Sequence, residues 1–446
     1  MPEQHPLQTG WDLTEPRPAV AAFLGTLPAR PQLLALGEPT HLLDAFPAWR
    51  NRLFRILVED HGFRSIALES DIIAGQRVNA HVTSGQGTPG RHSVTLPRVL
   101  GGNSTARRPH HGFSLRSAQK GSATFLSTAL EEVMQTGFSH GFGAVKANRE
   151  LVEWMRDFNA GRNPADHLRF YGFDAPLENL WAASPRASLL ALHAFLTAHL
   201  GKLPVDTATL EQLCGEDTRW TNPAAGMDAA ESIGNSGEAR QLRWLADDLC
   251  TLLRTETPGL AAQPEFWEAR LHARTATGLL LYHAVLADPA PNRVARMLAL
   301  RDLLMADHLS DLAEREQERG PTLVFAHNAH LQRNISTMRM GETRLEWWSA
   351  GAHVSLRLGQ QYAFIASDLG AAPAKGIEEP GPDTLQGVLM NLAGPVSLVA
   401  SRELTTALPQ DLTRRTDVPP RAGYFPLAAQ DLPLTDGVLF VKNAAN

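Results

Sequence analysis

The stretch "LLALGEPTHLLDAF" (residues 33–46) joins an apolar run to a cluster of polar residues without a spacer. Its first half is typical of a buried strand, and Glu38 and His41 follow that strand three residues apart. Beyond them the sequence becomes amphipathic, which indicates a helix. A strand, a polar turn and a helix in this order predict an α/β unit with ionisable groups at the carboxyl end of its strand.

Further apolar runs, rich in β-branched and aromatic residues, repeat this pattern along the chain. They are "SIALES" (65–70), "LRFYGFD" (168–174), "PTLVFAHN" (321–328) and "QYAFIASD" (361–368), followed by "VSLVAS" (396–401) and "GVLFVK" (437–442). Continuous rather than alternating apolarity predicts strands that are covered on both faces. Because helical patterns lie between them, we predict an α/β fold with a mainly parallel central sheet flanked by helices.

The sequence patterns divide the chain into three segments. Residues 1–184 and 320–446 carry the strand signals and are predicted to form two parts of one α/β core. Residues 185–319 carry successive amphipathic helical patterns and no strand signal, which predicts a helical insertion or subdomain. Residues 85–125 are rich in Gly, Ser, Thr and Arg with little periodicity, so we expect a long loop that covers the cleft.

Composition limits the classes of partner. The 446 residues carry a formal net charge of -6 without a prominent basic run, which disfavours binding to nucleic acid or to a membrane surface. No stretch approaches the roughly 18 apolar residues of a membrane span, and the first residues lack the pattern of a signal peptide. The two cysteines have no CxxC spacing and suit a reducing compartment. We therefore expect a cytoplasmic protein, and the sequence leaves its oligomeric state open.

Ionisable residues follow four of the predicted strands, at the position where ligands bind to parallel sheets. They are Glu38 and His41, Glu69 and Asp71, Asp174, and His327 and His330. A single carboxylate after a strand is commonly a helix N-cap, and this alternative applies to Asp71 and Asp174. The occurrence of ionisable residues at four strand ends favours a shared functional site.

Two arginines lie on apolar faces of predicted helices, where an unpaired guanidinium is costly. Arg50 shares its stripe with Leu53, and about two helical turns separate it from His41. Arg301 is in register with Met305 on a later helix. We assign Arg50 to the active site, whereas a structural ion pair and a functional role are both open for Arg301.

Six stretches resemble the erythromycin esterase family, hydrolases that open macrolide lactone rings. They are "LALGEPTH", "LVEDHGFRSIALESD", "NRELVEWMRDFNAG", "RFYGFDAP", "LRDLLMADHL" and "VFAHNAHLQR", which together span most of residues 32–335. The resemblance implies that His41 is the essential histidine and that Glu38 and Glu69 are its accompanying carboxylates. It further implies that Arg50 is the family's arginine and that the later histidine pair is His327 and His330.

Two segments depart from the family. Residues 85–125 have no counterpart, and residues 185–290 match only loosely, so the resemblance leaves the substrate open. The predicted substrate-binding residues are Asp71, His140, Asp174 and Arg301. The expected partner is a small ester or lactone, such as an antibiotic or another secondary metabolite.

A water molecule is the predicted nucleophile, because no cysteine lies near the cluster and no elbow that presents a nucleophilic serine is expected. His41 would remove a proton from this water while Glu38 or Glu69 orients the imidazole. Arg50 and one of the two later histidines would stabilise the oxyanion, and the other histidine would protonate the leaving alkoxide.

Three different functions are also compatible with these residues. The five histidines and glutamates of the cluster offer nitrogen and oxygen donors that suit zinc, manganese or iron, so a divalent metal could generate the nucleophile. Apart from such a metal, no cofactor is expected. The same acid–base cluster could instead catalyse a cyclisation, an elimination or an addition on a natural product without hydrolysis. The third possibility is a binding protein that retains the pocket without catalysing a reaction.

Overall fold

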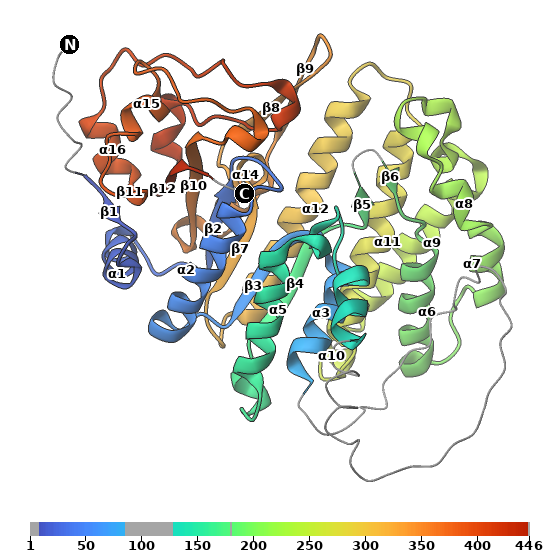
Figure 1. Ribbon diagram of the computed structural model, residues 1–446. Coiled ribbons are helices and arrows are strands. Elements are labelled where there is room, and N and C mark those ends of the chain that lie inside the picture. Colours follow the sequence, from blue (N-terminus) through green and yellow to red (C-terminus); the bar gives the residue numbers. More distant parts are fainter. Residues whose placement is uncertain (1–8, 85–127, 179–180, 445–446) are drawn as a thin grey trace, which may run out of the picture.

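The computed structural model describes residues 9–84, 128–178 and 181–444. Eight strands form one sheet in the order β1-β11-β12-β10-β2-β7-β3-β4 (Figure 1). They are β1 (Trp11–Asp12), β2 (Leu33–Glu38), β3 (Ser65–Asp71), β4 (Arg169–Asp174), β7 (Thr322–His327), β10 (Tyr362–Ala371), β11 (Val396–Ala400) and β12 (Gly437–Asn443). The six strands from β12 to β4 in this order are parallel to their neighbours. At the other edge, β11 pairs antiparallel with β12, and β1 pairs antiparallel with β11. The predicted α/β fold with a mainly parallel sheet is confirmed.

Helices cover both faces of the sheet. One face is covered by α1 (Pro16–Thr26), α2 (Ala45–His61), α3 (Ile72–Thr83) and α5 (Lys146–Asn159). The other face is covered by α12 (Arg293–Glu316), α13 (Asn328–Leu331) and α14 (Ala350–Leu358), with α15 (Leu385–Leu389) and α16 (Ser401–Ala407) over β11 and β12. Leu34 and Leu36 of β2 face the first set, and Leu33 and Ala35 face the second. Burial on both faces explains the continuously apolar strand sequences.

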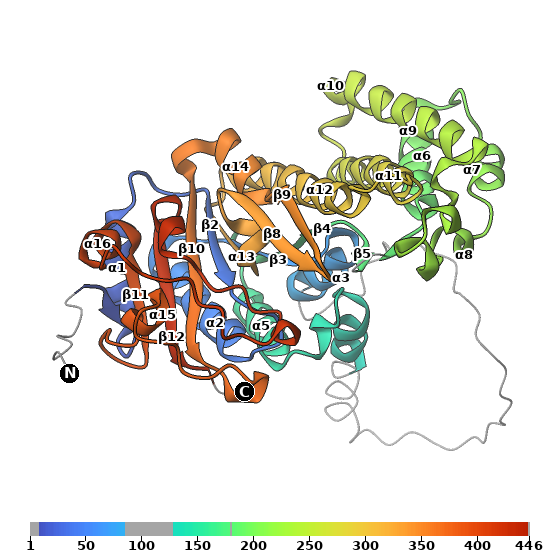
Figure 2. The same ribbon diagram turned by 90° about the horizontal axis from the view of Figure 1, so that it is seen from above.

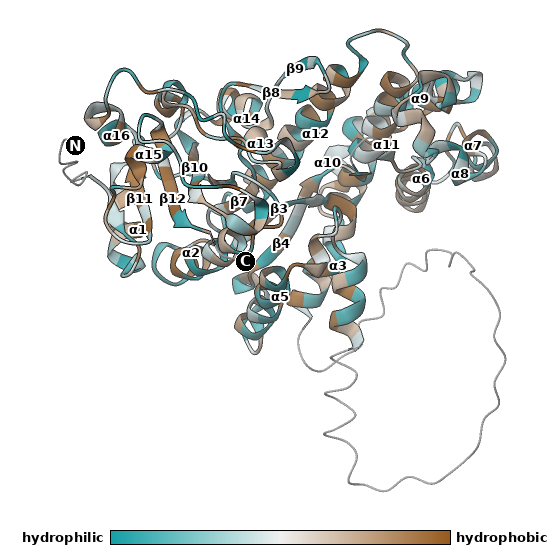
Figure 3. Ribbon diagram, turned by 45° about the horizontal axis from the view of Figure 1, so that its top comes forward, coloured by the Kyte–Doolittle hydropathy of each residue, from teal (hydrophilic) through white to brown (hydrophobic). Residues whose placement is uncertain are grey.

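Residues 186–286 form a helical region with a hydrophobic core of its own. Its helices are α6 (Arg186–Leu200), α7 (Thr207–Cys214), α8 (Asp217–Trp220), α9 (Gly237–Thr255), α10 (Thr257–Leu260) and α11 (Phe266–Leu286). Seen from above, this region stands to one side of the sheet (Figure 2). Teal and brown segments alternate along the helices, as their amphipathic sequences require (Figure 3).

Helix α12 also belongs to the segment predicted as a helical subdomain, 185–319, yet it packs against β4, β7 and the second sheet face. Two short antiparallel hairpins are additions that the sequence patterns did not predict. They are β5 (Leu177–Glu178) with β6 (Trp181–Ala182), and β8 (Ile335–Met340) with β9 (Thr343–Trp348). The covering loop predicted for residues 85–125 lies outside the described residues. Within the described residues, no helix is both long enough and apolar enough to cross a bilayer.

Candidate active site

The glycine before Glu38 allows three elements to meet at the carboxyl edge of the sheet. A Cβ atom on Gly37 would lie 2.0 Å from Asn328 Oδ1, so a larger residue has no room there. Asn328 Nδ2 donates to the Ser367 carbonyl at 2.7 Å, and Asn328 Oδ1 accepts from the Ser367 N–H at 3.1 Å. Gly37 thus lets α13 close against β2 and β10.

The loop after Glu38 is held in an unusual backbone conformation. The Lys375 ammonium donates to Thr40 Oγ1 at 3.0 Å and to the His41 carbonyl at 2.5 Å. Leu42 follows with a φ of 56°, and His140 on the opposite loop has the same value. These are the two non-glycine residues with positive φ in the described chain. Such conformations persist where the surrounding structure imposes them, frequently at functional sites.

Carboxylates and imidazoles alternate in a row across the strand ends. The Glu38 carboxylate accepts a hydrogen bond from His41 Nδ1 at 2.7 Å. His41 Nε2 lies 3.7 Å from Glu69 Oε1 and makes no hydrogen bond within the described residues. His330 Nε2 lies 3.3 Å from the same Glu69 oxygen, and His330 Nδ1 lies 2.5 Å from Asp302 Oδ1. The row therefore runs from Glu38 to Asp302 through two histidines and Glu69.

Electrostatic coupling in this row sets the charge of each group. Burial by itself lowers the pKa of His41, but Glu69 and Glu38 outweigh burial, so the pKa is raised. Burial also lowers the pKa of His330, but Asp302 and Glu69 raise it to about 10. For Glu69, burial raises the pKa, yet His330 and His41 bring it well below its usual value. Glu69 is accordingly ionised and His330 is protonated at neutral pH.

His327 has a different environment from its partner in the histidine pair. Its Nδ1 accepts from the Ala329 N–H at 3.1 Å, so Nε2 carries the proton and donates to the Pro39 carbonyl at 3.2 Å. Its backbone N–H donates to Glu69 Oε2 at 2.8 Å. Burial, together with the charge of His41, lowers the pKa of His327 to about 3. His327 is therefore neutral, and both of its ring nitrogens are occupied.

Three of the predicted substrate-binding residues contact one another. Arg301 Nη2 donates to Asp174 Oδ2 at 2.7 Å and to Glu69 Oε1 at 3.0 Å. His140 Nε2 lies 3.0 Å from the same Asp174 oxygen. Burial raises the pKa of Asp174, but Arg301 and His140 outweigh it and lower the pKa below its usual value. Arg301 thus has the ion-pair partners that its buried position requires.

Asp71, the fourth predicted substrate-binding residue, is the N-cap of α3. Its Oδ1 accepts from the N–H groups of Ile73 at 2.7 Å and Ala74 at 3.1 Å. Burial raises the pKa of this carboxyl to about 6. The helix N-cap role therefore describes its contacts, and substrate binding by Asp71 stays a prediction.

Arg50 lies on the buried face of α2, as predicted, with 1% of its surface exposed. Its guanidinium donates to Asn51 Oδ1 at 2.7 Å, to Asn148 Oδ1 at 2.8 Å and to the Ala147 carbonyl at 3.4 Å. Burial lowers the pKa of Arg50 to about 9, and the charge of Glu38 opposes this effect. Its hydrogen-bond partners are neutral groups, so they leave its positive charge uncompensated.

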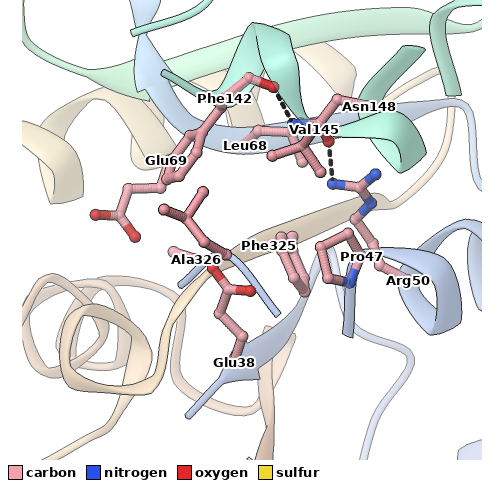
Figure 4. Close-up of a pocket in the computed structure, with 11 residues that line it drawn as sticks. Glu38, Pro47, Arg50, Leu68, Glu69, Phe142, Val145, Asn148, Phe325 and Ala326 are labelled. Carbon is pink, nitrogen blue, oxygen red and sulfur yellow. Dashed lines mark hydrogen bonds between the residues drawn. The ribbon is translucent and has the colours of Figure 1, made fainter. Parts of the chain in front are cut away.

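A small pocket lies between Arg50 and the two glutamates. Figure 4 shows Glu38 and Glu69 on one side and Arg50 with Asn148 on the other. Its walls are mainly apolar and include Leu42, Pro47, Leu68, Phe142, Val145, Phe325 and Ala326. Glu38 Oε2 is buried and has no hydrogen-bond partner in the described structure. The pocket thus combines apolar walls with a carboxylate oxygen that is free to accept a hydrogen bond.

Sequence reasoning overlooked a match to the nucleophile-elbow pattern. Residues 137–141 read "GFSHG", which fits G-x-S-x-G. They lie between the helical residues 128–136 and the 3-10 turn Phe142–Ala144, not between a strand and an α-helix. Ser139 Oγ accepts from the Asp71 N–H at 2.9 Å, which ties this loop to β3. Ser139 therefore has a structural contact, and no histidine of the described residues hydrogen-bonds to its hydroxyl.

Three further residues that contact the site's histidines or their partners were not predicted from the sequence. They are Asp302, Trp347 and Phe142. Asp302 could have been found, because it lies three residues before Met305 and seven before Leu309 on a buried stripe of α12. Phe142 packs against the His41 ring with a centroid separation of 5.4 Å, and nothing in the sequence marks that contact.

Among residues 9–84, 128–178 and 181–444, no three His, Cys, Asp or Glu side chains are arranged to hold a metal ion. The cluster's carboxylates instead accept hydrogen bonds from the cluster's own imidazole, guanidinium and backbone N–H groups. Metal dependence stays a prediction that metal analysis of the purified protein can test.

A parallel sheet with a histidine–carboxylate row at its carboxyl edge defines an α/β protein equipped for acid–base chemistry. The chain belongs to the erythromycin esterase family, because the family's sequence profile matches residues 58–442. It is thus an esterase-like hydrolase of that family. Glu38 and His41 precede the matched range.

Three solved structures have a similar fold. A Bacillus cereus protein is 16% identical with a TM-score of 0.64, covering 99% of this chain and 95% of that one. A succinoglycan biosynthesis protein is 17% identical with a TM-score of 0.60, covering 99% and 94%. A mutant of the erythromycin esterase EreC, in its open conformation, is 16% identical with a TM-score of 0.62, covering 98% and 97%.

Proposed function

We propose that this protein hydrolyses an ester or a macrolactone with a water molecule that His41 activates. The observation that carries the proposal is the asymmetry of the His41 ring. Its Nδ1 donates to Glu38, whereas its Nε2 makes no hydrogen bond within the described residues, and 37% of its side chain is exposed. The Glu38 contact holds the proton on Nδ1, so the lone pair of Nε2 is available to a water in the cleft.

The surrounding charges suit the transition state of ester hydrolysis. His330 is a buried cation close to Glu69, and Arg50 keeps its charge at neutral pH among neutral partners. A negative oxyanion that forms near the pocket is stabilised by both positive charges. Because His327 is neutral and His330 is protonated, His330 is the better candidate for the histidine that protonates the leaving alkoxide.

The test is a screen of macrolides and related lactones in ¹⁸O-labelled water, with products analysed by mass spectrometry. Hydrolysis places one labelled oxygen in the product acid, and His41→Asn should slow the formation of this product by about 100-fold or more. The matched control is His199→Asn, which changes an exposed histidine on α6 outside the site. Turnover without label would favour a cyclisation, an elimination or an addition.

Two further outcomes would point to ligand binding alone or to a metal-dependent reaction. Ligand binding that His41→Asn weakens, without turnover of any substrate, would favour a non-catalytic binding protein. Activity that follows the content of a bound divalent metal, and is lost on chelation, would favour a metal-generated nucleophile.

A further inference from the structure

Asp302 is a buried carboxylate whose oxygens both have assigned partners. It lies on α12 and has no exposed surface. Its Oδ1 lies 2.5 Å from His330 Nδ1, and its Oδ2 accepts from Trp347 Nε1 at 2.8 Å. Within the described residues, its ion-pair partner is His330. A buried carboxylate is unfavourable without a cation, and His330 is the cation in contact with Asp302.

This arrangement fixes both the orientation and the charge of the His330 ring. Nδ1–H points to Asp302 and Nε2–H points toward Glu69 Oε1, so both ring nitrogens carry protons. The ring is held between two carboxylates from α12 and β3. Trp347 has only 7% of its surface exposed, and its fixed indole N–H in turn orients Asp302.

We infer that Asp302, itself held by Trp347, is a positioning residue that keeps His330 oriented and protonated for the reaction of the candidate site. The inference rests on the proposed function for its catalytic consequence. Asp302 acts through His330, and no contact of Asp302 with substrate is required. The β8–β9 hairpin, which supplies Trp347, therefore contributes to the positioning of His330.

Several charged groups face His330 and determine in which direction the loss of Asp302 shifts the pKa values of the two histidines. Glu69 Oε1 lies 3.0 Å from Arg301, 3.3 Å from His330 and 3.7 Å from His41. The neutral His327 faces the same site, and Asp302 closes it on the α12 side. His330 as a cation lowers the pKa of His41. Loss of the Asp302 charge should therefore lower the pKa of His330, and once His330 is neutral the pKa of His41 should rise.

The experiment is the pH profile of kcat for Asp302→Asn on a substrate identified by the screen. We expect kcat to fall about 100-fold at neutral pH, with little change in KM, because a positioned acid contributes on this order. The falling limb, which follows the deprotonation of His330, should move from about pH 10 to lower pH. The rising limb, which follows the deprotonation of His41, should move to higher pH, so the profile narrows. Trp347→Phe, which removes the indole N–H together with part of the ring, should shift both limbs in the same directions by less.

The matched control is Asp307→Asn on the same helix, where the carboxylate pairs with Arg357 at the surface. This variant should leave both limbs in place. A folded Asp302→Asn enzyme with unshifted limbs would overturn the inference, even if kcat fell, because that result indicates a merely structural role. If Asp302→Asn fails to fold, unshifted limbs in folded Trp347→Phe overturn the inference equally.

NMR titration of the His330 ring separates failure of this inference from failure of the proposed function. The titration needs no substrate and compares the wild type with Asp302→Asn and Trp347→Phe. A downward shift of the His330 midpoint in both variants supports the positioning role, even if every ester proves inert. An unchanged midpoint in both variants refutes the positioning role, whatever the enzyme hydrolyses.

Discussion

Arg50→Lys keeps the buried charge on α2 but removes the planar guanidinium. In the wild type, Arg50 is the donor to Asn51 Oδ1 and to Asn148 Oδ1, and the Ala147 carbonyl has a second donor in Asn51 Nδ2 at 2.7 Å. The Lys ammonium lacks the planar fork with which Arg50 reaches both amide oxygens, so one of these oxygens becomes a buried acceptor without a donor. An unsatisfied buried group costs about 1–3 kcal/mol, which is the expected loss in the free energy of unfolding.

Urea unfolding followed by circular dichroism measures this loss, with Arg52→Lys as the matched control. Arg52 lies on the same helix, exposed, with its guanidinium over the Trp49 ring, so its replacement should cost less than about 0.5 kcal/mol. Equal unfolding midpoints for the two variants would refute the hydrogen-bond account of Arg50. If Arg50→Lys loses stability but keeps its kcat per folded molecule, Arg50 ties α2 to α5 and does not stabilise the oxyanion.

Four other outcomes are expected. His41→Asn should lower kcat by about 100- to 10,000-fold and remove the rising limb of the pH profile, which in the wild type should lie above the ordinary imidazole pKa because that of His41 is raised; near-native kcat would exclude the base role. Glu69→Gln should reduce activity less than His41→Asn if Glu69 only orients groups, and an equal loss would point to a shared metal. Gly37→Ala should displace Asn328 and cost about 2–4 kcal/mol in urea unfolding, since two buried hydrogen bonds break. Because the pKa of His330 is about 10 in the folded protein and 6.5 in the reference state, its stabilising contribution is complete below pH 6.5 and is lost as the pH rises to 10; constant unfolding midpoints over this range would contradict its ion pair.

The main strands of the central sheet and the polar residues at their ends could be predicted from local sequence patterns. Runs such as "LLALGE" are apolar at nearly every position because both faces of each strand are covered, and this signal is local. Parallel strands bring their carboxyl ends to one edge, so the polar residues that follow them were predictable as neighbours. On that basis Glu38, His41, Glu69 and His330 were expected together, and they lie in one row.

How those residues share their protons could not be predicted from the sequence, because it depends on packing between distant segments. His327 and His330 lie three residues apart in one motif, yet the first is neutral against the Pro39 carbonyl and the second is a cation against Asp302. The difference comes from Asp302 on α12, which long-range packing brings against α13, and from Trp347 on a hairpin with no strong strand signal. Protonation depends on burial and on charges within a few ångströms, and the distances between segments remote in sequence are fixed only by packing.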